Sequence, residues 1–252
     1  MRPPAPDISR GPNPRRSFAP TVAACLGGAA VLAHVAPAAV GWRSARCALT
    51  PRLAGIGRPD HIALTFDDGP DPTSTPRILD ALDELAWRAT FFCLGSQARR
   101  YPQVVAEVAN RGHEVAVHGE AHRSHLLRSA PAVVKDVLAA RDLLQELSGR
   151  QLRWFRPPYG AVGAPTLVAA RRSGLTLVLW SAWGKDWQAG ASGAHVATEV
   201  GRTSVGGDTV LLHDCDVTSA PGSWRATVDS LPLLAERWSR RALTVGPLSE
   251  HF

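Results

Sequence analysis

Two short motifs contain side chains of the types that bind metal ions and move protons. The first is Asp67-Asp68, which follows an apolar run and precedes Gly69-Pro70. Side chains alternate along a strand, so two neighbouring carboxylates at its end point in different directions. One carboxylate can then bind a cation while the other stays free as a base. Taken alone, the motif also fits an ordinary solvated acidic turn.

The second motif is His118-Gly119-Glu120-Ala121-His122. This spacing on one helical turn would aim both imidazoles at one point, as a divalent metal ion requires. Taken alone, the pair also fits two unrelated loop histidines. With Asp68, the imidazoles would form an open site with room for water, which is the catalytic pattern. A closed structural zinc site would need a fourth ligand, and no cysteine has suitable spacing.

The pattern of apolar residues predicts the elements that position these motifs. From residue 61 onward, short β-rich runs alternate with amphipathic stretches. We predict seven strands, at His61–Phe66, Ala89–Leu94, Glu114–His118, Trp154–Arg156, Leu175–Trp180, Asp208–His213 and Leu243–Pro247. Helical periodicity predicts helices over Thr75–Leu85, Tyr101–Asn110 and Ala132–Leu147.

This alternation predicts an α/β fold with a parallel sheet. A closed barrel and a doubly wound open sheet would both fit the pattern. In either architecture, active residues gather at the carboxyl ends of the strands. The chemically notable residues fall at those predicted ends, namely Asp67, Asp68, His118, Arg156, Asp186 and His213.

The charge distribution excludes one class of partner. The chain has a net charge of +6, from 28 Lys and Arg against 22 Asp and Glu. The excess lies in residues 1–60, which contain eight Arg against two Asp, whereas residues 61–252 contain equal numbers of basic and acidic side chains. A nucleic-acid-binding body would need a basic face to neutralise phosphates. We therefore expect no nucleic-acid partner.

The first 58 residues differ in composition from the rest of the chain. Residues 1–16 are rich in Pro and Arg, and residues 18–42 contain no Asp, Glu, Lys or Arg. Such a stretch is long enough to cross a bilayer, and Arg15-Arg16 before it provide the positive region of an export signal. We predict that residues 1–58 form a disordered basic leader with a signal or anchor at about 18–42.

The remaining residues, 59–252, are predicted to form one catalytic domain. We expect this body to be exported, and to be either membrane-anchored or extracellular, with membrane association through residues 18–42. A floppy leader or a misassigned start codon is the alternative explanation of the N-terminal arm. We expect the protein to be a monomer.

Five motifs follow one another along the body in a distinctive order. They are TFDDGP at 65–70, HGEAH at 118–122, RPPYG at 156–160, KDW at 185–187 and LLHD at 211–214. In this order they resemble the motifs of NodB-type polysaccharide deacetylases, carbohydrate esterase family four, over about residues 60–250. The resemblance implies a distorted (β/α) barrel with about seven strands. It also implies a metal-dependent hydrolase that removes N-acetyl groups from amino sugars of a glycan, such as peptidoglycan or a chitin-like oligomer.

The resemblance implies roles for the residues of the first three motifs. Asp67 would be the general base, and Arg156 would hold it in place through an ion pair. The ligands of one divalent metal ion would be Asp68, His118 and His122. Zinc is the first expectation for this ion, with cobalt or nickel as alternatives, because the ligand types are only borderline selective.

Further roles are implied around the reacting group. The backbone N–H of Tyr159 would help to stabilise the oxyanion. Asp186 would orient His213, the general acid that protonates the leaving amine. Trp187 and Leu211 would form the apolar wall of the acetyl pocket.

The sequence departs from the family pattern at three positions. Gly119 and Arg123 stand where the second motif usually has Ser or Thr and then Pro. Trp183 stands where the fourth motif usually has a small polar or acidic residue. Together with Trp180 and Trp187 it forms an aromatic group, for which packing in the barrel core and a sugar-stacking wall both remain open.

Three classes of function are compatible with this body. The first is a deacetylase of N-acetyl sugars. The second is a hydrolase of the same fold that acts on a cyclic imide, a ureide or an O-acetyl ester. The third is a glycan-binding protein with an inactive site. The sequence favours the first, because no key residue is missing and the N-terminal segment counts against a cytoplasmic enzyme.

Overall fold

A computed structural model of the chain describes residues 43–252, so residues 1–42 of the predicted leader, with the hydrophobic segment at 18–42, lie outside the described residues. Residues 43–58, predicted as the end of this disordered leader, instead form a short helix and a turn that pack on the body. Ala54 is fully buried, and the carbonyl of Leu53 accepts a hydrogen bond of 2.8 Å from the N–H of Leu179. The helices are α2 Arg43–Leu49, α3 Thr75–Glu84, α4 Gly95–Arg100, α5 Pro102–Asn110, α6 Ala130–Ser148, α7 Ala164–Ser173, α8 Gly193–Thr203 and α9 Trp224–Ser239, with short 3₁₀ turns η2 His125–Leu127, η3 Pro158–Gly160 and η4 Leu248–Glu250. The strands are β1 His61–Asp67, β2 Thr90–Cys93, β3 Glu114–Val117, β4 Trp154–Phe155, β5 Thr176–Leu177, β6 Ala182–Trp183, β7 Thr209–His213 and β8 Thr244–Gly246. No helix within residues 43–252 has the length and apolar character that a membrane crossing requires.

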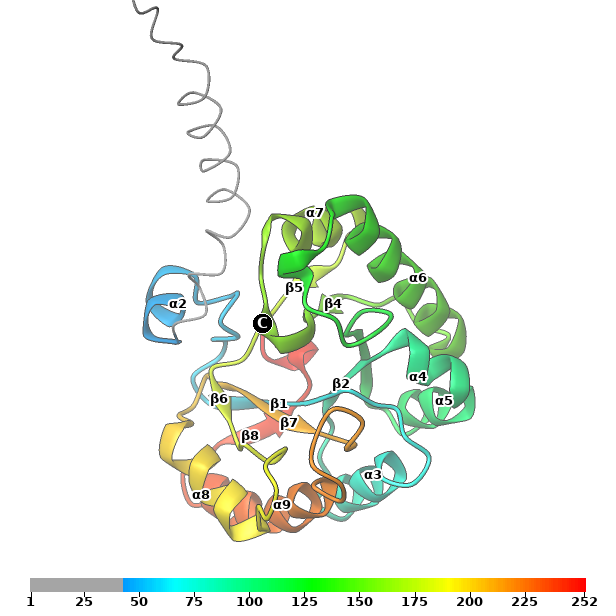
Figure 1. The fold of residues 1–252 in the computed structure, drawn as a ribbon. Coiled ribbons are helices and arrows are strands. Elements are labelled where there is room, and N and C mark those ends of the chain that lie inside the picture. The colour runs from blue at the N-terminus through cyan, green and yellow to red at the C-terminus, as the bar shows by residue number, and fades with distance from the viewer. Residues whose placement is uncertain (1–42) are drawn as a thin grey trace, which may run out of the picture.

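All the strands belong to one parallel sheet. Its order is β5-β4-β3-β2-β1-β7-β6, with β8 joined to β1. Each of the seven predicted strands is present, and the short β6 is an addition that the apolar pattern did not predict. No ladder in the described part of the chain joins β5 to β6, and the sheet curls into a barrel that is open between them (Figure 1). The predicted α/β fold with a distorted barrel is confirmed.

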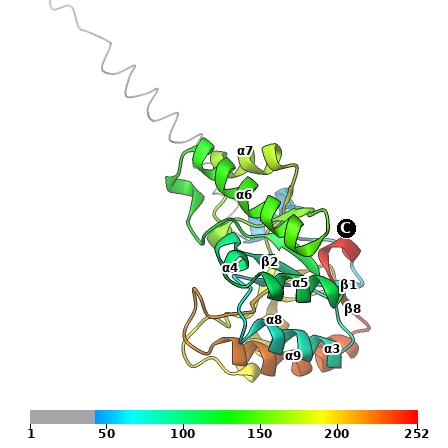
Figure 2. The ribbon, with the colours of Figure 1, turned by 90° about the vertical axis from the view of Figure 1, so that its right-hand side faces the viewer.

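The helices surround the outside of the curled sheet. In Figure 1, α3, α8 and α9 lie along the lower edge and α4 to α7 along the right and the top, and Figure 2 shows the same separation from the side. Helices α5, α6 and α7 each have a proline in the first turn, where a missing N–H costs nothing. Gly149 and Gly174 end α6 and α7 with φ of 65° and 70°, a conformation that favours glycine.

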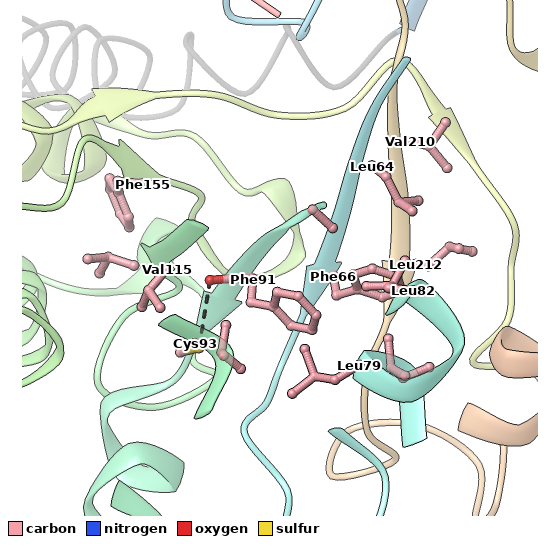
Figure 3. Packing of buried hydrophobic residues seen from close by; sticks show 14 of the residues in the cluster. Leu64, Phe66, Leu79, Leu82, Phe91, Cys93, Val115, Phe155, Val210 and Leu212 are labelled. Carbon is pink, nitrogen blue, oxygen red and sulfur yellow. Dashed lines mark hydrogen bonds between the residues drawn. The ribbon is translucent and has the colours of Figure 1, made fainter. Parts of the chain in front are cut away.

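The outward face of the sheet forms the main hydrophobic core with these helices. Phe66 of β1 stacks on Phe91 of β2 with ring centroids 5.0 Å apart. Leu79 and Leu82 of α3 pack against this part of the sheet (Figure 3). Burying a side chain of this size stabilises the fold by about 1.5–3 kcal/mol. The helices are therefore fixed firmly against the strands whose ends carry the polar motifs.

The inward face has a different character. Ala63, Phe92 and Trp154 belong to a smaller apolar cluster that is separate from the main core. Because side chains alternate along β1, Thr65 and Asp67 share the face of Ala63. The last residue of β1 is therefore directed into the mouth of the barrel.

Candidate metal centre and active site

Three metal-ligating side chains converge at the carboxyl ends of β1 and β3. The Oδ1 atom of Asp68 lies 3.3 Å from Nε2 of His118 and 3.5 Å from Nε2 of His122. One ligand atom from each residue lies within 4.8 Å of the others. Two ligands of a tetrahedral zinc ion are separated by about 3.3 Å, because each lies about 2.0–2.1 Å from the ion. The spacing of these donor atoms therefore fits an ion of that size.

The backbone around the two histidines differs from the expectation. His118 directly follows β3, and residues 118–124 form an irregular loop rather than a helical turn. The prediction that one helical turn aligns both imidazoles is therefore wrong. Gly119 has φ of 95°, which no regular helix allows, and its carbonyl accepts a hydrogen bond of 2.9 Å from the N–H of Gly95. The loop folds back onto the start of α4, and this tertiary contact sets its shape.

Hydrogen bonds leave the three donor atoms free to face a cation. Nδ1 of His118 lies 2.8 Å from the carbonyl oxygen of Arg156, so it carries the proton and Nε2 keeps its lone pair. The hydroxyl of Thr218 donates to Oδ2 of Asp68. Oδ1 of Asp68 is buried and has no hydrogen-bond partner within residues 43–252. A buried carboxylate oxygen without a donor is an arrangement that a cation would complete.

The carboxylates and imidazoles of the site shift one another's pKa values. Burial alone would raise the pKa of Asp68, but the neighbouring imidazole of His118 lowers that pKa well below its usual value. Burial would lower the pKa of His118, but the carboxylates of Asp67 and Asp68 raise it above its usual value. For His122, burial dominates and lowers the pKa. His122 therefore already prefers the neutral form that binds metal, whereas His118 would lose its proton when an ion binds.

Asp67 occupies a different environment from its neighbour. Its Oδ1 accepts a hydrogen bond of 2.7 Å from Nη1 of Arg156, which is fully buried and also donates to Thr65 at 2.8 Å and to the carbonyl of Leu179 at 2.8 Å. Its Oδ2 lies 3.8 Å from Nε2 of His118. Arg156 thus fixes one oxygen of Asp67, and the other oxygen faces the metal-ligand cluster. Because Asp68 has a φ of 84°, the two adjacent carboxylates point to different partners.

His213 and Asp186 form a second ionisable pair at the same end of the barrel. Asp186 accepts hydrogen bonds from Nδ1 of His213 at 2.9 Å, from the backbone N–H of His213 at 2.7 Å and from the hydroxyl of Thr227 at 2.8 Å. Burial would lower the pKa of His213, but the charge of Asp186 and its hydrogen bond raise that pKa to about 9. This pKa favours the protonated imidazole, in which Nε2–H is the proton not engaged by Asp186.

The ladder between β1 and β7 relates the two ionisable sites. Asp67 is the register partner of His213 in this parallel pair. Side chains of register partners lie on the same face of a sheet. The carboxylate and the imidazolium therefore sit beside each other at the barrel mouth, at a separation that backbone hydrogen bonds determine.

These groups line one cavity of about 290 Å³. Its lining consists of Asp67, Asp68, His118, His122, Tyr159, Trp180, Trp183, Trp187, Leu211, His213, Thr218 and Ser219. All predicted site residues line it except Arg156 and Asp186, which contact it through Asp67 and His213. The structure thus brings together the residues that the sequence places about 150 positions apart.

Tyr159 contributes to the rim through an unusual backbone conformation. It has φ of 61° in η3, and its ring lies edge-on to His122 with centroids 4.2 Å apart. Tyr159 therefore lies at the edge of the metal-ligand cluster, beside one of its imidazoles.

Sequence reasoning missed the residues that support these side chains from a distance. Thr218 contacts Asp68 from a loop before α9, and Asp214 accepts hydrogen bonds from the N–H of Gly69 at 3.0 Å and from Thr75 at 2.5 Å. Burial raises the pKa of Asp214 to about 7. Only Asp214 had a local signal, since it directly follows the histidine of the fifth motif. No pattern near Thr218 marks it as a partner of a residue so far away in the chain.

Asp136 of α6 supports the histidine loop. Its side chain is only 9% exposed, and its Oδ2 accepts a hydrogen bond of 3.0 Å from the N–H of Glu120. Its Oδ1 lies 3.1 Å from a guanidinium nitrogen of Arg128. A Cβ atom at Gly119 would lie 3.2 Å from Oδ2 of Asp136. The carboxylate therefore occupies the space beside the glycine and braces the loop from outside.

Replacing Asp136 by alanine is expected to weaken metal binding by about 10- to 100-fold, the usual cost of losing a group that orients metal ligands. Asp136→Asn should be intermediate, because its amide oxygen can still accept from Glu120. The measurement is competition for zinc with a chromophoric chelator. Asp142→Ala is the matched control, since Asp142 lies on the same helix and is 63% exposed. Unchanged affinity in a folded Asp136→Ala protein would show that Asp136 does not position the ligands.

Comparison with known proteins gives several matches. The profile of a family described as polysaccharide deacetylase matches residues 54–178. A peptidoglycan-N-acetylglucosamine deacetylase of Bacillus cereus is 32% identical over 180 residues, which are 71% of this chain and 65% of the relative. This chain thus spans slightly less than two thirds of that relative. A chitooligosaccharide deacetylase of a Bradyrhizobium strain is 34% identical over 200 residues, which are 75% of this chain and 89% of the relative.

A solved structure is similar over most of the described chain. It is the crystal structure of the Bc1960 peptidoglycan N-acetylglucosamine deacetylase in complex with a naphthalenyl N-hydroxybenzamide. The two share 28% sequence identity with a TM-score of 0.71, and the match covers 78% of this chain and 91% of the other.

Proposed function

Because the chain belongs to the polysaccharide deacetylase family, we propose that it is a metal-dependent hydrolase that removes N-acetyl groups from the amino sugars of a glycan. The observation that carries this proposal is the convergence of three groups on one cavity. A cation site, a carboxylate with a free oxygen and a protonated imidazole all line it. Hydrolysis of an amide needs these three functions within reach of one carbonyl group.

Asp67 would act as the base. Its Oδ2 is free of Arg156 and faces the metal-ligand cluster, so it can accept the proton of an attacking water. Arg156 holds the carboxylate in this orientation from inside the barrel. The N–H of Tyr159 would donate to the oxyanion that forms, and losing one such donor typically costs about 10²–10³ in rate.

His213 would act as the acid. The amine is a poor leaving group unless it is protonated, and the Nε2–H of His213 faces the cavity on the β7 side. Asp186 holds the ring in place and keeps it charged. The base and the acid thus flank the cavity from adjacent strands, so that one can receive a proton while the other gives one.

Asp68, His118 and His122 would bind the divalent ion, which supplies polarisation of the amide carbonyl and acidification of the attacking water. We propose zinc, and cobalt or nickel would also suit the mixed imidazole and carboxylate ligands. Metal content of the purified chain and reactivation of the stripped chain by each ion test this choice. If magnesium alone fully reactivated the stripped chain, the assignment of zinc, cobalt or nickel would be wrong.

Replacing Asp186 by asparagine is expected to move the basic limb of the rate profile to lower pH. His213 must be protonated to act, so activity is lost as pH rises through its pKa of about 9. Asp186→Asn removes the main group that raises this pKa, while burial continues to lower it. The limb should move by at least one pH unit, measured as kcat/KM against pH. An unmoved limb would mean that Asp186 has only a structural role.

The reaction itself is tested by mass spectrometry. The metal-loaded chain is incubated with N-acetylglucosamine oligomers and with muropeptides, and loss of acetyl mass is measured. The His118→Ala chain serves as the inactive control. We expect deacetylation of at least one of these substrates. Cleavage of simple acetate esters without any loss from N-acetyl sugars would instead identify an esterase.

We also propose that the body works outside the cytoplasm as a monomer, tethered through residues 18–42. The uncharged run and the confinement of the basic excess to residues 1–60 support this location. Fractionation with protease shaving should find the body membrane-associated and accessible from outside. Recovery of the full-length chain from the cytosol in soluble form would contradict the location, and light scattering tests the monomer.

A further inference from the structure

Three tryptophans form a continuous aromatic wall at the cavity. Trp187 lies edge-on to His213 with ring centroids 5.6 Å apart, and Trp183 follows at 5.2 Å from Trp187. Trp180 stacks on Trp183 at 6.1 Å with an interplanar angle of 30°. All three rings line the cavity. The wall therefore runs from His213 through Trp187 and Trp183 to Trp180.

Two rings of this wall, Trp180 and Trp183, are held by neighbouring groups. A Cβ at Gly160 would lie 2.7 Å from the ring of Trp180, so this glycine allows η3 to pack closely against it. The guanidinium of Arg156 lies 5.7 Å from the same ring. Trp183 is set by strand pairing, since its register partner is Leu211 of β7. The wall is thus a fixed surface rather than a set of loose side chains.

Trp183 differs from its two neighbours in exposure. It remains 39% exposed, whereas Trp180 and Trp187 are half-buried. A large exposed aromatic ring that continues a cavity wall is typical of a ligand-binding surface. The C–H face of a pyranose ring is apolar and flat, and it can cover such a ring without leaving a polar group unpaired. Trp183 lies one ring beyond Trp187, which contacts the proposed acid.

The charges of the cavity restrict which sugars fit. Its carboxylates and imidazoles come from two aspartates and three histidines, and none of its described lining residues is Lys or Arg. Arg46 lies 5.8 Å from the ring of Trp180, but it donates a hydrogen bond of 2.7 Å to the carbonyl oxygen of Trp180. Two further cations, which are close in sequence to the lining, are also engaged elsewhere. Lys185 pairs with Glu199 at 2.9 Å, and Arg225 lies over the ring of Trp224 at 4.5 Å. A carboxylate on a sugar that covers Trp183 would therefore find no Lys or Arg among the described lining residues.

We propose that Trp183 is a specificity-determining residue that stacks on the neighbouring sugar of a neutral N-acetylglucosamine oligomer, and that the wall disfavours sugars with an acidic lactyl group. This inference rests on the proposed deacetylase function and names its substrate class. Trp183 acts on binding of the chain of sugars and not on the chemical step. Its removal should therefore raise KM and leave kcat nearly unchanged.

The test compares substrates of two lengths. For Trp183→Ala, we expect kcat/KM on the N-acetylglucosamine tetramer to fall about three- to tenfold, mainly through KM, with little change on the monomer. Trp183→Phe should restore most of the loss, because it keeps an aromatic face. Leu233→Ala is the matched control, since Leu233 is 43% exposed and lies on α9 away from the cavity. No loss on the tetramer, or an equal loss on both substrates, would overturn the proposal.

The second arm tests charge. A peptide-free tetramer in which alternate sugars carry the lactyl carboxylate should be at least about tenfold poorer as a substrate than the neutral tetramer, and equal rates would overturn this part. The affinity of the His118→Ala chain for the neutral tetramer, measured by calorimetry, distinguishes failure of the deacetylase function from failure of the proposed role of Trp183. If no substrate is deacetylated but Trp183→Ala still weakens this binding, the wall is upheld and the deacetylase function fails. If deacetylation occurs and Trp183→Ala changes nothing, only the wall fails.

Discussion

Replacing His118 by alanine is expected to abolish metal binding and to reduce deacetylation by at least about 10³-fold. His118 is 2% exposed, its Nδ1–H donates to the carbonyl of Arg156, and its Nε2 lies 3.3 Å from Asp68. No other side chain could take the place of this buried imidazole as a ligand. The remaining two ligands would bind an ion too weakly to retain it during purification.

Metal content by mass spectrometry and kcat/KM at saturating zinc are the measurements. The wild-type chain should contain about one ion, and the variant should contain none. His195→Ala is the control, because this histidine is exposed at the start of α8 and lies away from the cavity. A metal-free preparation with full activity would overturn the metal centre altogether.

Substitution of the two adjacent aspartates by asparagine should give opposite results. Asp67→Asn is expected to retain the ion and to lose turnover by about 10²–10⁴-fold, because a base is removed and no ligand is lost. Asp68→Asn should weaken metal binding itself, because the carboxylate that accepts from Thr218 and faces both histidines loses its charge. Parallel measurement of zinc affinity and kcat distinguishes the two.

The two aspartates differ in their partners, and this difference affects how the two variants are compared. Asp67 is tied to Arg156 at 2.7 Å, so Asp67→Asn also leaves a buried guanidinium without its counter-charge. Unfolding in urea is therefore measured for both variants, with turnover compared only at temperatures where each is folded. Equal loss of zinc in both variants would show that the assignment of base and ligand is wrong.

The sequence predicts the strands well because their patterns are local. Buried runs such as residues 61–66 alternate with amphipathic helices, and a parallel sheet then places Asp67, His118 and His213 at one end. Resemblance to known motifs adds roles for these residues that spacing alone leaves open. The position of these residues at the carboxyl ends of the strands and the order of the motifs therefore indicate the same active-site residues.

The errors and omissions have a common physical origin in tertiary contacts. The helical turn expected over residues 118–122 is absent, because Gly119 adopts a φ of 95° while the loop packs on α4 and Asp136. β6 has only two residues and exists because β7 offers it a free edge. Contacts such as that of Thr218 with Asp68 join segments about 150 residues apart. None of these features leaves a periodic signal in the nearby sequence.

The pairing of Asp67 with His213 in the β1–β7 ladder has a consequence for how proteins of this kind diverge. Inserting or deleting one residue in β7 would reverse the inward and outward faces beyond that point, so that Leu212 or Asp214 would replace the imidazole at the cavity. Changes of length are therefore not tolerated where the reaction is carried out. Trp183 lies in β6, which has only two residues, and Thr218 lies in a loop. The loops next to these two residues are outside the β1–β7 ladder, so they can be lengthened or exchanged without disturbing it. Homologous proteins can thus differ in substrate preference while they retain the same reaction.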